Sequence, residues 1–240
     1  MRDVVQNHIL QVLSLVAMEP PPGRGMDVIN DRKRDVFVAM PEADPAHYVR
    51  GQYRGYLDVA GVAPGSQTET YCAMRLEIDN WRWSGVPVFI RTGKCLPVTQ
   101  TELRLVFQRP PRVGFHLQRS RPPEPMQLIV KLDPTTGVRL LLEAQGAHST
   151  DPEQIHLDME FSDEGGEGPT PYEVLLLAAM NGDSTRFTRQ DGVEEAWRIM
   201  QPLLDAPPPV HPYAKGSWGP AEADGLLSGY GRWHEPWVGS

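Results

Sequence analysis

The sequence is poor in cysteine and has no long apolar run. Its 240 residues include only Cys72 and Cys95. Both lie in apolar, strand-like segments without the spacing of a disulfide framework or a metal site, which favours a reducing cytosol. No apolar run is long enough to span a bilayer. The first residues do not form a signal peptide, because Asp3 and the polar residues 6–8 interrupt them. We therefore expect a soluble, cytoplasmic protein.

Positive charge, metal-ligand motifs and glycine-rich loops are also lacking. The 31 acidic and 23 basic residues give a formal net charge of -8, whereas a nucleic-acid-binding protein would present a basic patch. The seven histidines include no i, i+4 pair, so no metal site is expected. Neither phosphate-binding glycine motif occurs between a strand and a helix, and the "GGEG" at 165–168 is expected to be a loop. No G-x-S-x-G motif marks a serine hydrolase.

Alternating residues predict that the middle of the chain is rich in strands. In "TETYCAMRLEID", Cys72, Met74, Leu76 and Ile78 recur with a period of two, which is typical of a strand with one buried face. Further strands are predicted within 47–57, 86–93, 101–109, 126–133, 138–146 and 155–162. Because these strands are short and joined by short turns, antiparallel pairing is favoured over parallel crossovers.

Helical segments are predicted on both sides of the strands. Residues 2–18 read as a buried helix that ends at "MEPPPG", and further helices are predicted near 27–40, 170–182 and 189–205. From about Pro207 the chain is rich in proline, glycine and aromatic residues and is expected to lie extended over the surface. The prediction is an α+β class: one domain over residues 1–240, with one broad antiparallel sheet and an extended tail.

Two polar side chains stand out in the first helix. A lone histidine such as His8 on an apolar helix is more often a core group held by a local hydrogen bond. Asp3, however, precedes it by five residues. At 3.6 residues per turn the two side chains would lie roughly 140° apart, so that they could flank a ligand at the start of the helix. A carboxylate that accepts hydroxyl hydrogens and an imidazole that takes a proton suit a sugar.

Lys94 is a second candidate, in "RTGK" at the end of a predicted strand. A lysine in a loop is ordinarily just a solvated side chain. Arg91 stands three residues earlier, and the two cations at one strand end could together hold an anionic group.

Longer strings carry a resemblance to a known family. In chain order, "RDVVQNHILQVLSLVAMEPP", "VRGQYRGY", "TETYCAMRLEIDNWRWSGVPVFIRTGKCLP", "PYEVLLLAAMNGD" and "EEAWRIMQPLL…YAKGSWGPAEAD" resemble the C-terminal domain of glucose-6-phosphate dehydrogenase, from about residue 2 to about residue 227. That family oxidises C1 of glucose 6-phosphate to the lactone with NADP. The resemblance implies a large, mainly antiparallel sheet of about nine strands with helices packed on one face. In the family this sheet forms the contact of a homodimer.

The resemblance also implies roles for single residues. The histidine of the family's Q-N-H motif, here His8, is the general base, and the aspartate of its R-D motif, here Asp3, binds sugar hydroxyls. The lysine of R-T-G-K, here Lys94, contacts the substrate on its phosphate side. The Rossmann domain that binds NADP, and the D-H-Y-L-G-K-E motif, are not among these residues. The chain alone is therefore expected to be inactive and to bind glucose 6-phosphate weakly.

Departures from the family pattern leave a second interpretation open. Many members have basic residues where this chain has Thr99 and Gln100, and a glutamine where it has Asp133. An aspartate that faces a phosphate would repel it. The alternative is thus a non-catalytic sugar-phosphate-binding or dimerisation module derived from the enzyme.

A further departure concerns a second, structural NADP that animal members hold in this domain. Arg104 and Lys131 keep the basic character of that site, whereas Gln100 and Trp218 do not. The resemblance therefore predicts that a structural NADP site is absent or weak here.

Overall fold

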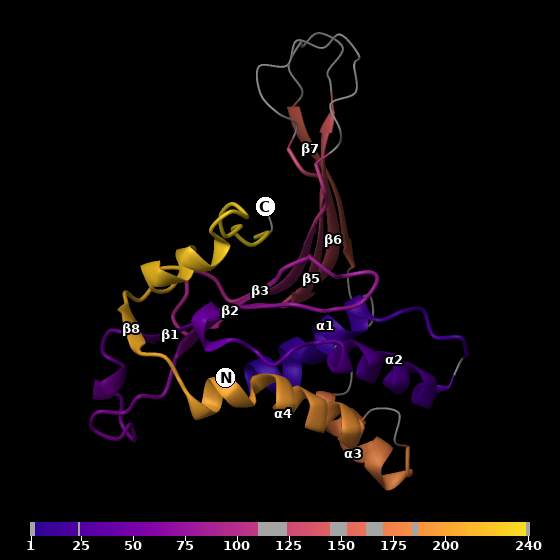
Figure 1. The fold of residues 1–240 in the computed structure, drawn as a ribbon, viewed down its shortest axis with the longest axis horizontal. Coiled ribbons are helices and arrows are strands. Elements are labelled where there is room, and N and C mark those ends of the chain that lie inside the picture. The colour runs from indigo at the N-terminus through magenta and orange to yellow at the C-terminus, as the bar shows by residue number, and fades with distance from the viewer. Residues whose placement is uncertain are drawn as a thin grey trace. The chain divides into compact units, whose positions relative to one another are not determined.

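The computed structural model describes residues 3–23, 25–109, 124–144, 153–161, 170–183 and 187–238. They form an α+β fold (Figure 1), which confirms the predicted class. The chain divides into two compact units, Met1–Pro97 with Pro169–Trp233 and Val98–Gly168 with His234–Ser240. The "GGEG" segment lies outside the described residues.

The first unit contains a four-stranded sheet in the order β3-β2-β1-β8. Its strands are β1 Tyr48–Tyr53, β2 Tyr71–Leu76, β3 Val88–Gly93 and β8 Val210–Tyr213. β1 pairs with β2, and β2 with β3, in antiparallel register, whereas β8 lies parallel to β1. The sheet thus joins the middle of the chain to its C-terminal part.

The helices of this unit begin with the π-helical turn η1 at Val4–Ile9, which continues directly into an α-helix. The others are α1 Leu10–Ala17, α2 Met26–Val38, α3 Pro171–Met180 and α4 Gln190–Asp205, with 3-10 turns η2 Pro45–His47, η3 Tyr56–Asp58 and η5 Ala221–Leu227. Among the described helices, none is long and apolar enough to cross a membrane.

One face of the first sheet is covered by η1, α1, α2 and α4, which share a hydrophobic core with it. α4 buries Ala196, Ile199, Met200 and Leu203, a spacing of three and four residues that forms one apolar helix face. Arg198 on the same helix donates hydrogen bonds to the carbonyl oxygens of residues 37 and 40 at the end of α2. These contacts fix the helices over the sheet.

The opposite face of the first sheet is buried as well. Tyr71 and Ala73 on β2 have exposed fractions of 1% and 0%, and they pack in a second hydrophobic cluster with Leu226 and Leu227 of η5. The strand therefore has two buried faces where the alternation predicts one. Its other apolar face, which includes Cys72 and Met74, packs against the helices. Burial raises the pKa of the Cys72 thiol to about 12.

The segment from Pro207, which the composition predicts to be an extended tail, contains regular structure. It adds β8 to the edge of the first sheet beside β1, and η5 then crosses the opposite face. Tyr213 in β8 is only 3% exposed. Several aromatic and apolar residues of this segment, such as Tyr213, Leu226 and Leu227, are therefore core residues, which composition alone does not distinguish from a surface tail.

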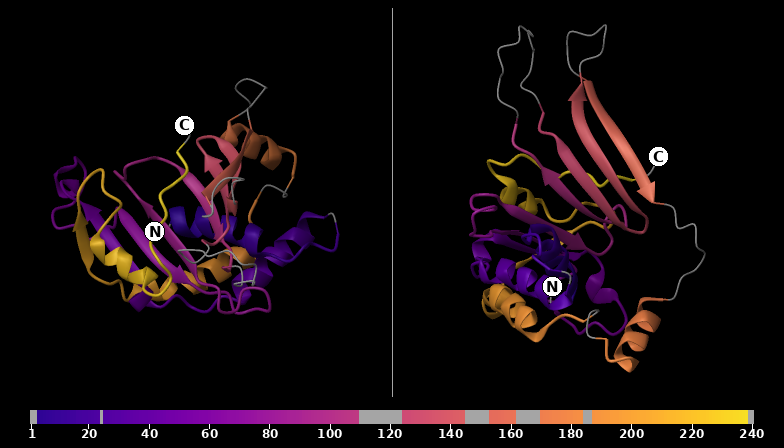
Figure 2. Two further views of the ribbon diagram at one scale, coloured as in Figure 1. Left: turned by 90° about the horizontal axis from the view of Figure 1, so that it is seen from above. Right: turned by 90° about the vertical axis from the view of Figure 1, so that its right-hand side faces the viewer.

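The second unit contains an antiparallel sheet in the order β4-β5-β6-β7. Its strands are β4 Thr101–Val106, β5 Gln127–Asp133, β6 Thr136–Ala144 and β7 Glu153–Phe161, and Figure 2 shows the long strands of this sheet side by side. The described strands thus form two four-stranded sheets, so the single sheet of about nine strands is not confirmed. After β3, the left-handed backbone of Cys95 (φ 54°) turns the chain before β4 begins.

The register gives the two faces of the second sheet different characters. One face is lined by apolar side chains that pair across the strands: Leu103, Leu105, Leu128, Val130, Val138, Leu140, Leu142, Ile155, Leu157 and Met159. The other face carries Glu102, Arg104, Lys131 and Arg139, and the C-terminal Trp237 packs on it with an exposed fraction of 4%.

Candidate functional site

The first helical turn brings Asp3 and His8 together. The N–H of Leu10 bonds to the carbonyl oxygen of Val5, so the turn is π-helical, and residues five apart lie above one another in such a turn. The Asp3 carboxylate is accordingly 3.7 Å from Nε2 of His8. The separation of roughly 140° expected for an α-helix does not apply, because the helix is wound more widely here. Single π turns inside helices occur frequently at functional sites.

This pair lies on the solvent side of the turn. The side chains of His8 and Asp3 are 70% and 82% exposed, whereas Val5 and Gln6 on the inner side are buried. The description of His8 as a core histidine held by a local hydrogen bond does not fit such exposure. The pair instead offers a carboxylate acceptor and an imidazole to a ligand that approaches from outside.

Lys94 follows β3 in a turn whose backbone is held by hydrogen bonds. Its N–H donates to the carbonyl oxygen of Thr70 over 2.7 Å, and the carbonyl oxygen of the next residue, Cys95, accepts from the N–H of Gly216 over 2.8 Å. Cys95 has a φ of 54°, which is uncommon for a residue other than glycine. The Lys94 side chain is exposed. A fixed backbone with an exposed ammonium group suits the binding of an anion.

Arg91 contacts aromatic rings within the same unit. Its guanidinium carbon lies 4.7 Å from the ring centre of Trp218 and 4.9 Å from that of Trp233. Such distances are typical of cation–π contacts. The contacts of Arg91 thus fit a role in packing the second hydrophobic cluster better than a site shared with Lys94.

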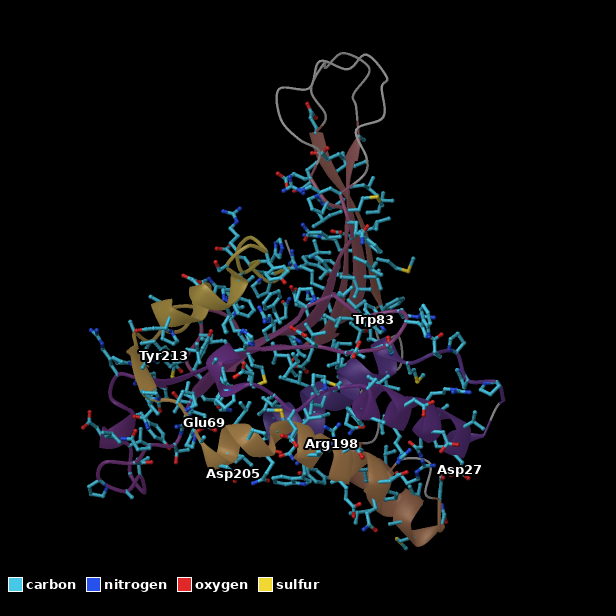
Figure 3. The ribbon with its side chains drawn as sticks, viewed as in Figure 1. Asp27, Glu69, Trp83, Arg198, Asp205 and Tyr213 are labelled. Atoms are coloured by element: carbon cyan, nitrogen blue, oxygen red, sulfur yellow. The ribbon has the colours of Figure 1, made fainter. Side chains whose placement is uncertain are left out.

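The candidate residues lie away from the β2–β3 turn. The indole N–H of Trp83 in that turn donates to the carbonyl oxygen of Ala17 at the C-terminal end of α1. The π turn η1, which contains His8 and directly follows Asp3, lies at the other end of α1. Lys94 follows the opposite end of β3, beside Tyr213, which Figure 3 shows far from Trp83. Among the described contacts, no hydrogen bond or ion pair joins Lys94 to Asp3 or His8.

Thr99, Gln100 and Asp133, which depart from the family pattern, lie in the second unit, whereas Trp218 lies in the first. Gln100 donates a hydrogen bond to Glu102, and Asp133 is exposed at the end of β5. In the part of the chain that the structure describes, no group of three potential metal ligands comes together.

Sequence reasoning missed the residues that hold the Lys94 turn. Thr70 and Tyr213 both bond to it, yet Tyr213 is separated from Lys94 by more than a hundred residues and belongs to a segment expected to be a surface tail. No local sequence pattern predicts such a contact.

These features define an α+β domain with an exposed carboxylate–imidazole pair and a basic turn, and comparison with known proteins places it in a family. A family model described as "Glucose-6-phosphate dehydrogenase, C-terminal domain" matches residues 1–235. The chain therefore belongs to this family, which confirms the resemblance.

Individual relatives agree with this assignment. Glucose-6-phosphate 1-dehydrogenase 1 of Mycobacterium tuberculosis H37Rv is 53% identical over 239 residues, which cover 99% of this chain and 50% of that protein. Glucose-6-phosphate 1-dehydrogenase of Aggregatibacter actinomycetemcomitans is 40% identical over 257 residues, which cover 98% of this chain and 51% of that protein. This chain thus spans about half the length of the curated relatives it matches.

Solved structures match over the same half. The crystal structure of glucose-6-phosphate 1-dehydrogenase from Mycobacterium avium superposes with a TM-score of 0.90 at 53% identity, covering 100% of this chain and 51% of that one. A glucose-6-phosphate dehydrogenase in complex with its substrate glucose 6-phosphate matches with a TM-score of 0.82 at 29% identity, covering 98% and 51%.

Proposed function

We propose that this chain is the substrate-binding half of a glucose-6-phosphate dehydrogenase, which oxidises glucose 6-phosphate in the cytoplasm with NADP. The observation that carries the proposal is the exposed Asp3–His8 pair, 3.7 Å apart on a π turn. Support comes from the family match over residues 1–235 and from a structural neighbour that was solved with glucose 6-phosphate.

The proposed chemistry divides between the two halves of the enzyme. His8 removes the proton of the C1 hydroxyl while Asp3 accepts hydrogen bonds from sugar hydroxyls, and Lys94 lies on the phosphate side. NADP would be held by the other half of the enzyme and would supply the acceptor for the hydride that leaves C1 as the sugar becomes a lactone. A positioned base contributes typically 10²–10⁴-fold in rate, and hydride transfer needs the reacting atoms about 3–3.5 Å apart. The isolated chain should therefore bind glucose 6-phosphate weakly and turn nothing over.

We further propose that this chain holds no structural NADP. Arg104 and Lys131, which the family pattern assigns to that site, have partners in the chain itself. Arg104 donates to Glu102, to Gln127 and to the carbonyl oxygen of residue 235, and Nζ of Lys131 lies 4.8 Å from the ring centre of Trp237. A phosphate would have to displace these contacts, so the residues present do not fit a second cofactor.

The second sheet is proposed to form a homodimer. Its apolar face includes Leu157 and Met159, each 61% exposed, and the partner strands add apolar side chains in register. Contiguous exposed apolar surface of this kind typically marks an interface.

The competing proposal is a non-catalytic module that binds a sugar phosphate or only dimerises. Thr99 and Asp133 favour it, since each replaces a residue that suits a phosphate in many family members. If this module is non-catalytic, substitutions of Asp3 or His8 abolish no enzymatic activity.

The two proposals are separated by a chimeric enzyme. The N-terminal half of the Mycobacterium tuberculosis relative is joined to this chain, and NADP reduction with glucose 6-phosphate is followed at a wavelength specific for NADPH. We expect turnover from the chimera and none from this chain alone. A folded chimera that binds NADP and does not oxidise glucose 6-phosphate would support the non-catalytic module. Steady turnover by the chain alone would contradict the division between two halves.

A further inference from the structure

A buried tyrosine from the C-terminal part of the chain bonds to the backbone of the Lys94 turn. The hydroxyl of Tyr213 donates a hydrogen bond of 2.7 Å to the carbonyl oxygen of Lys94. The side-chain hydroxyl of Thr70 lies 3.0 Å from the same phenol oxygen, and the carbonyl oxygen of Thr70 accepts from the N–H of Lys94. Tyr213 and Thr70 thus hold both the N–H side and the carbonyl side of Lys94.

The ring of Tyr213 has little freedom to move. It is 3% exposed and lies 5.5 Å from the ring of Tyr71 and 6.4 Å from that of Tyr53. A Cβ added to Gly51 would lie only 3.1 Å from the ring. Burial also raises the pKa of Tyr213, so its hydroxyl stays protonated and keeps its donor hydrogen.

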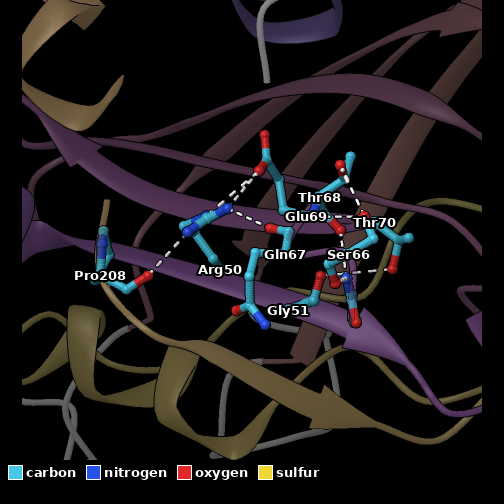
Figure 4. Close-up of polar contacts among 9 residues, drawn as sticks. Arg50, Gly51, Ser66, Gln67, Thr68, Glu69, Thr70 and Pro208 are labelled. Carbon is cyan, nitrogen blue, oxygen red and sulfur yellow. Dashed lines mark hydrogen bonds and ion pairs between the residues drawn. The ribbon is translucent and has the colours of Figure 1, made fainter. Parts of the chain in front are cut away.

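The strands around this contact are themselves held by a partly buried ion pair. Arg50 on β1 bonds to Glu69 over 3.0 Å, to the carbonyl oxygen of Gln67, and to the carbonyl oxygen of Pro208 just before β8 (Figure 4). Arg50 therefore anchors both the segment that carries Thr70 and the segment that leads to Tyr213.

The turn itself needs such support. The left-handed φ of 54° at Cys95 is a backbone conformation that persists only when the surroundings hold it. The hydrogen bond to the carbonyl group of Lys94 acts on the peptide unit that precedes this strained residue.

We propose that Tyr213 is a positioning residue that sets the direction of the Lys94 side chain towards the phosphate of the substrate. The proposal rests on the proposed function, in which Lys94 contacts that side of glucose 6-phosphate. Tyr213 does not touch the substrate in this role. Its hydroxyl fixes the peptide group of Lys94, and the position of this backbone sets where the ammonium group of the side chain can reach.

The test compares Tyr213→Phe with Tyr53→Phe in the chimeric enzyme that joins the N-terminal half of the Mycobacterium tuberculosis relative to this chain. Tyr213→Phe keeps the ring and removes the hydroxyl. We expect the KM for glucose 6-phosphate to rise three- to tenfold with kcat within twofold, and kcat/KM for glucose, which has no phosphate, to stay unchanged. Tyr53→Phe removes a hydroxyl from a neighbouring ring and should leave all these constants unchanged.

A double-mutant cycle with Lys94→Ala gives the specific readout. If Tyr213 acts through Lys94, the Tyr213→Phe change adds nothing to KM once Lys94 is alanine. Equal effects of Tyr213→Phe in both backgrounds, or an unchanged KM in the single variant, would overturn the proposal. Equal losses for glucose and glucose 6-phosphate would show a purely structural role and overturn it as well.

Hydrogen exchange of the Lys94 amide provides a second measurement that does not depend on turnover. We expect faster exchange in Tyr213→Phe than in wild type or Tyr53→Phe, and equal exchange rates would contradict the proposal. Failure of the proposed function is recognised separately, because the wild-type enzyme would then not oxidise glucose 6-phosphate.

Discussion

The indole ring of Trp237 lies against the guanidinium group of Arg139, with 4.4 Å between the ring centre and the guanidinium carbon. Lys131 lies over the same ring, and the backbone N–H of Trp237 donates to the Glu102 carboxylate over 2.8 Å. A residue near the end of the chain is thus bound to three strands of the second sheet, and it covers part of the polar face of that sheet.

The first prediction concerns this contact. Trp237→Ala should destabilise the second unit by about 3–5 kcal/mol, because a buried tryptophan and its cation–π contacts are lost together. Chemical unfolding monitored by circular dichroism measures the change. Trp81→Ala is the control: its side chain is fully exposed, and the change should stay within about 0.5 kcal/mol. Equal stability losses in the two variants would show that the C-terminal contact does not support the sheet.

The second prediction tests His8 as general base. In the chimeric enzyme, the proposed role of His8 predicts that His8→Asn lowers kcat by about 10²–10⁴-fold, because the C1 hydroxyl proton would lose its acceptor, while KM changes less. His156→Asn is a matched control, since His156 is also exposed and lies 3.8 Å from an aspartate, Asp158. It should leave kcat unchanged. A decrease below threefold in the His8 variant would argue against the catalytic role.

The third prediction concerns the apolar face of the second sheet. Leu157→Glu should dissociate the proposed dimer, because burying an unpaired carboxylate in an apolar interface is costly. Light scattering at micromolar concentration measures the mass. Gln154→Glu is the control, because it adds the same charge to the same strand but on the opposite, polar face of the sheet. This variant should remain dimeric. A wild-type chain that is monomeric at this concentration would refute the dimer in the isolated domain.

Much of the secondary structure was predictable from local pattern. The period-two alternation around Met74 indicates a strand, and the three-and-four spacing of the apolar residues Ala196, Ile199, Met200 and Leu203 indicates a helix, because backbone geometry sets these periods. The α+β class follows from them. The candidate residues Asp3, His8 and Lys94 lie in sequence motifs that resemble the family, and these motifs can be read from the sequence without a three-dimensional structure.

Only the tertiary structure decided how these pieces combine. The wide π turn that brings Asp3 to His8 also buries Val5 and Gln6, and an α-helical wheel does not show it. Tyr213 reaches Lys94 because β8 pairs with β1, and pairing between distant strands has no local signature. The sequence by itself determined the periodicity of the apolar residues in the strands and helices and the chemical groups of the candidate site, because both are properties of short segments. The tertiary structure decided which groups meet, because such contacts depend on packing across the whole chain.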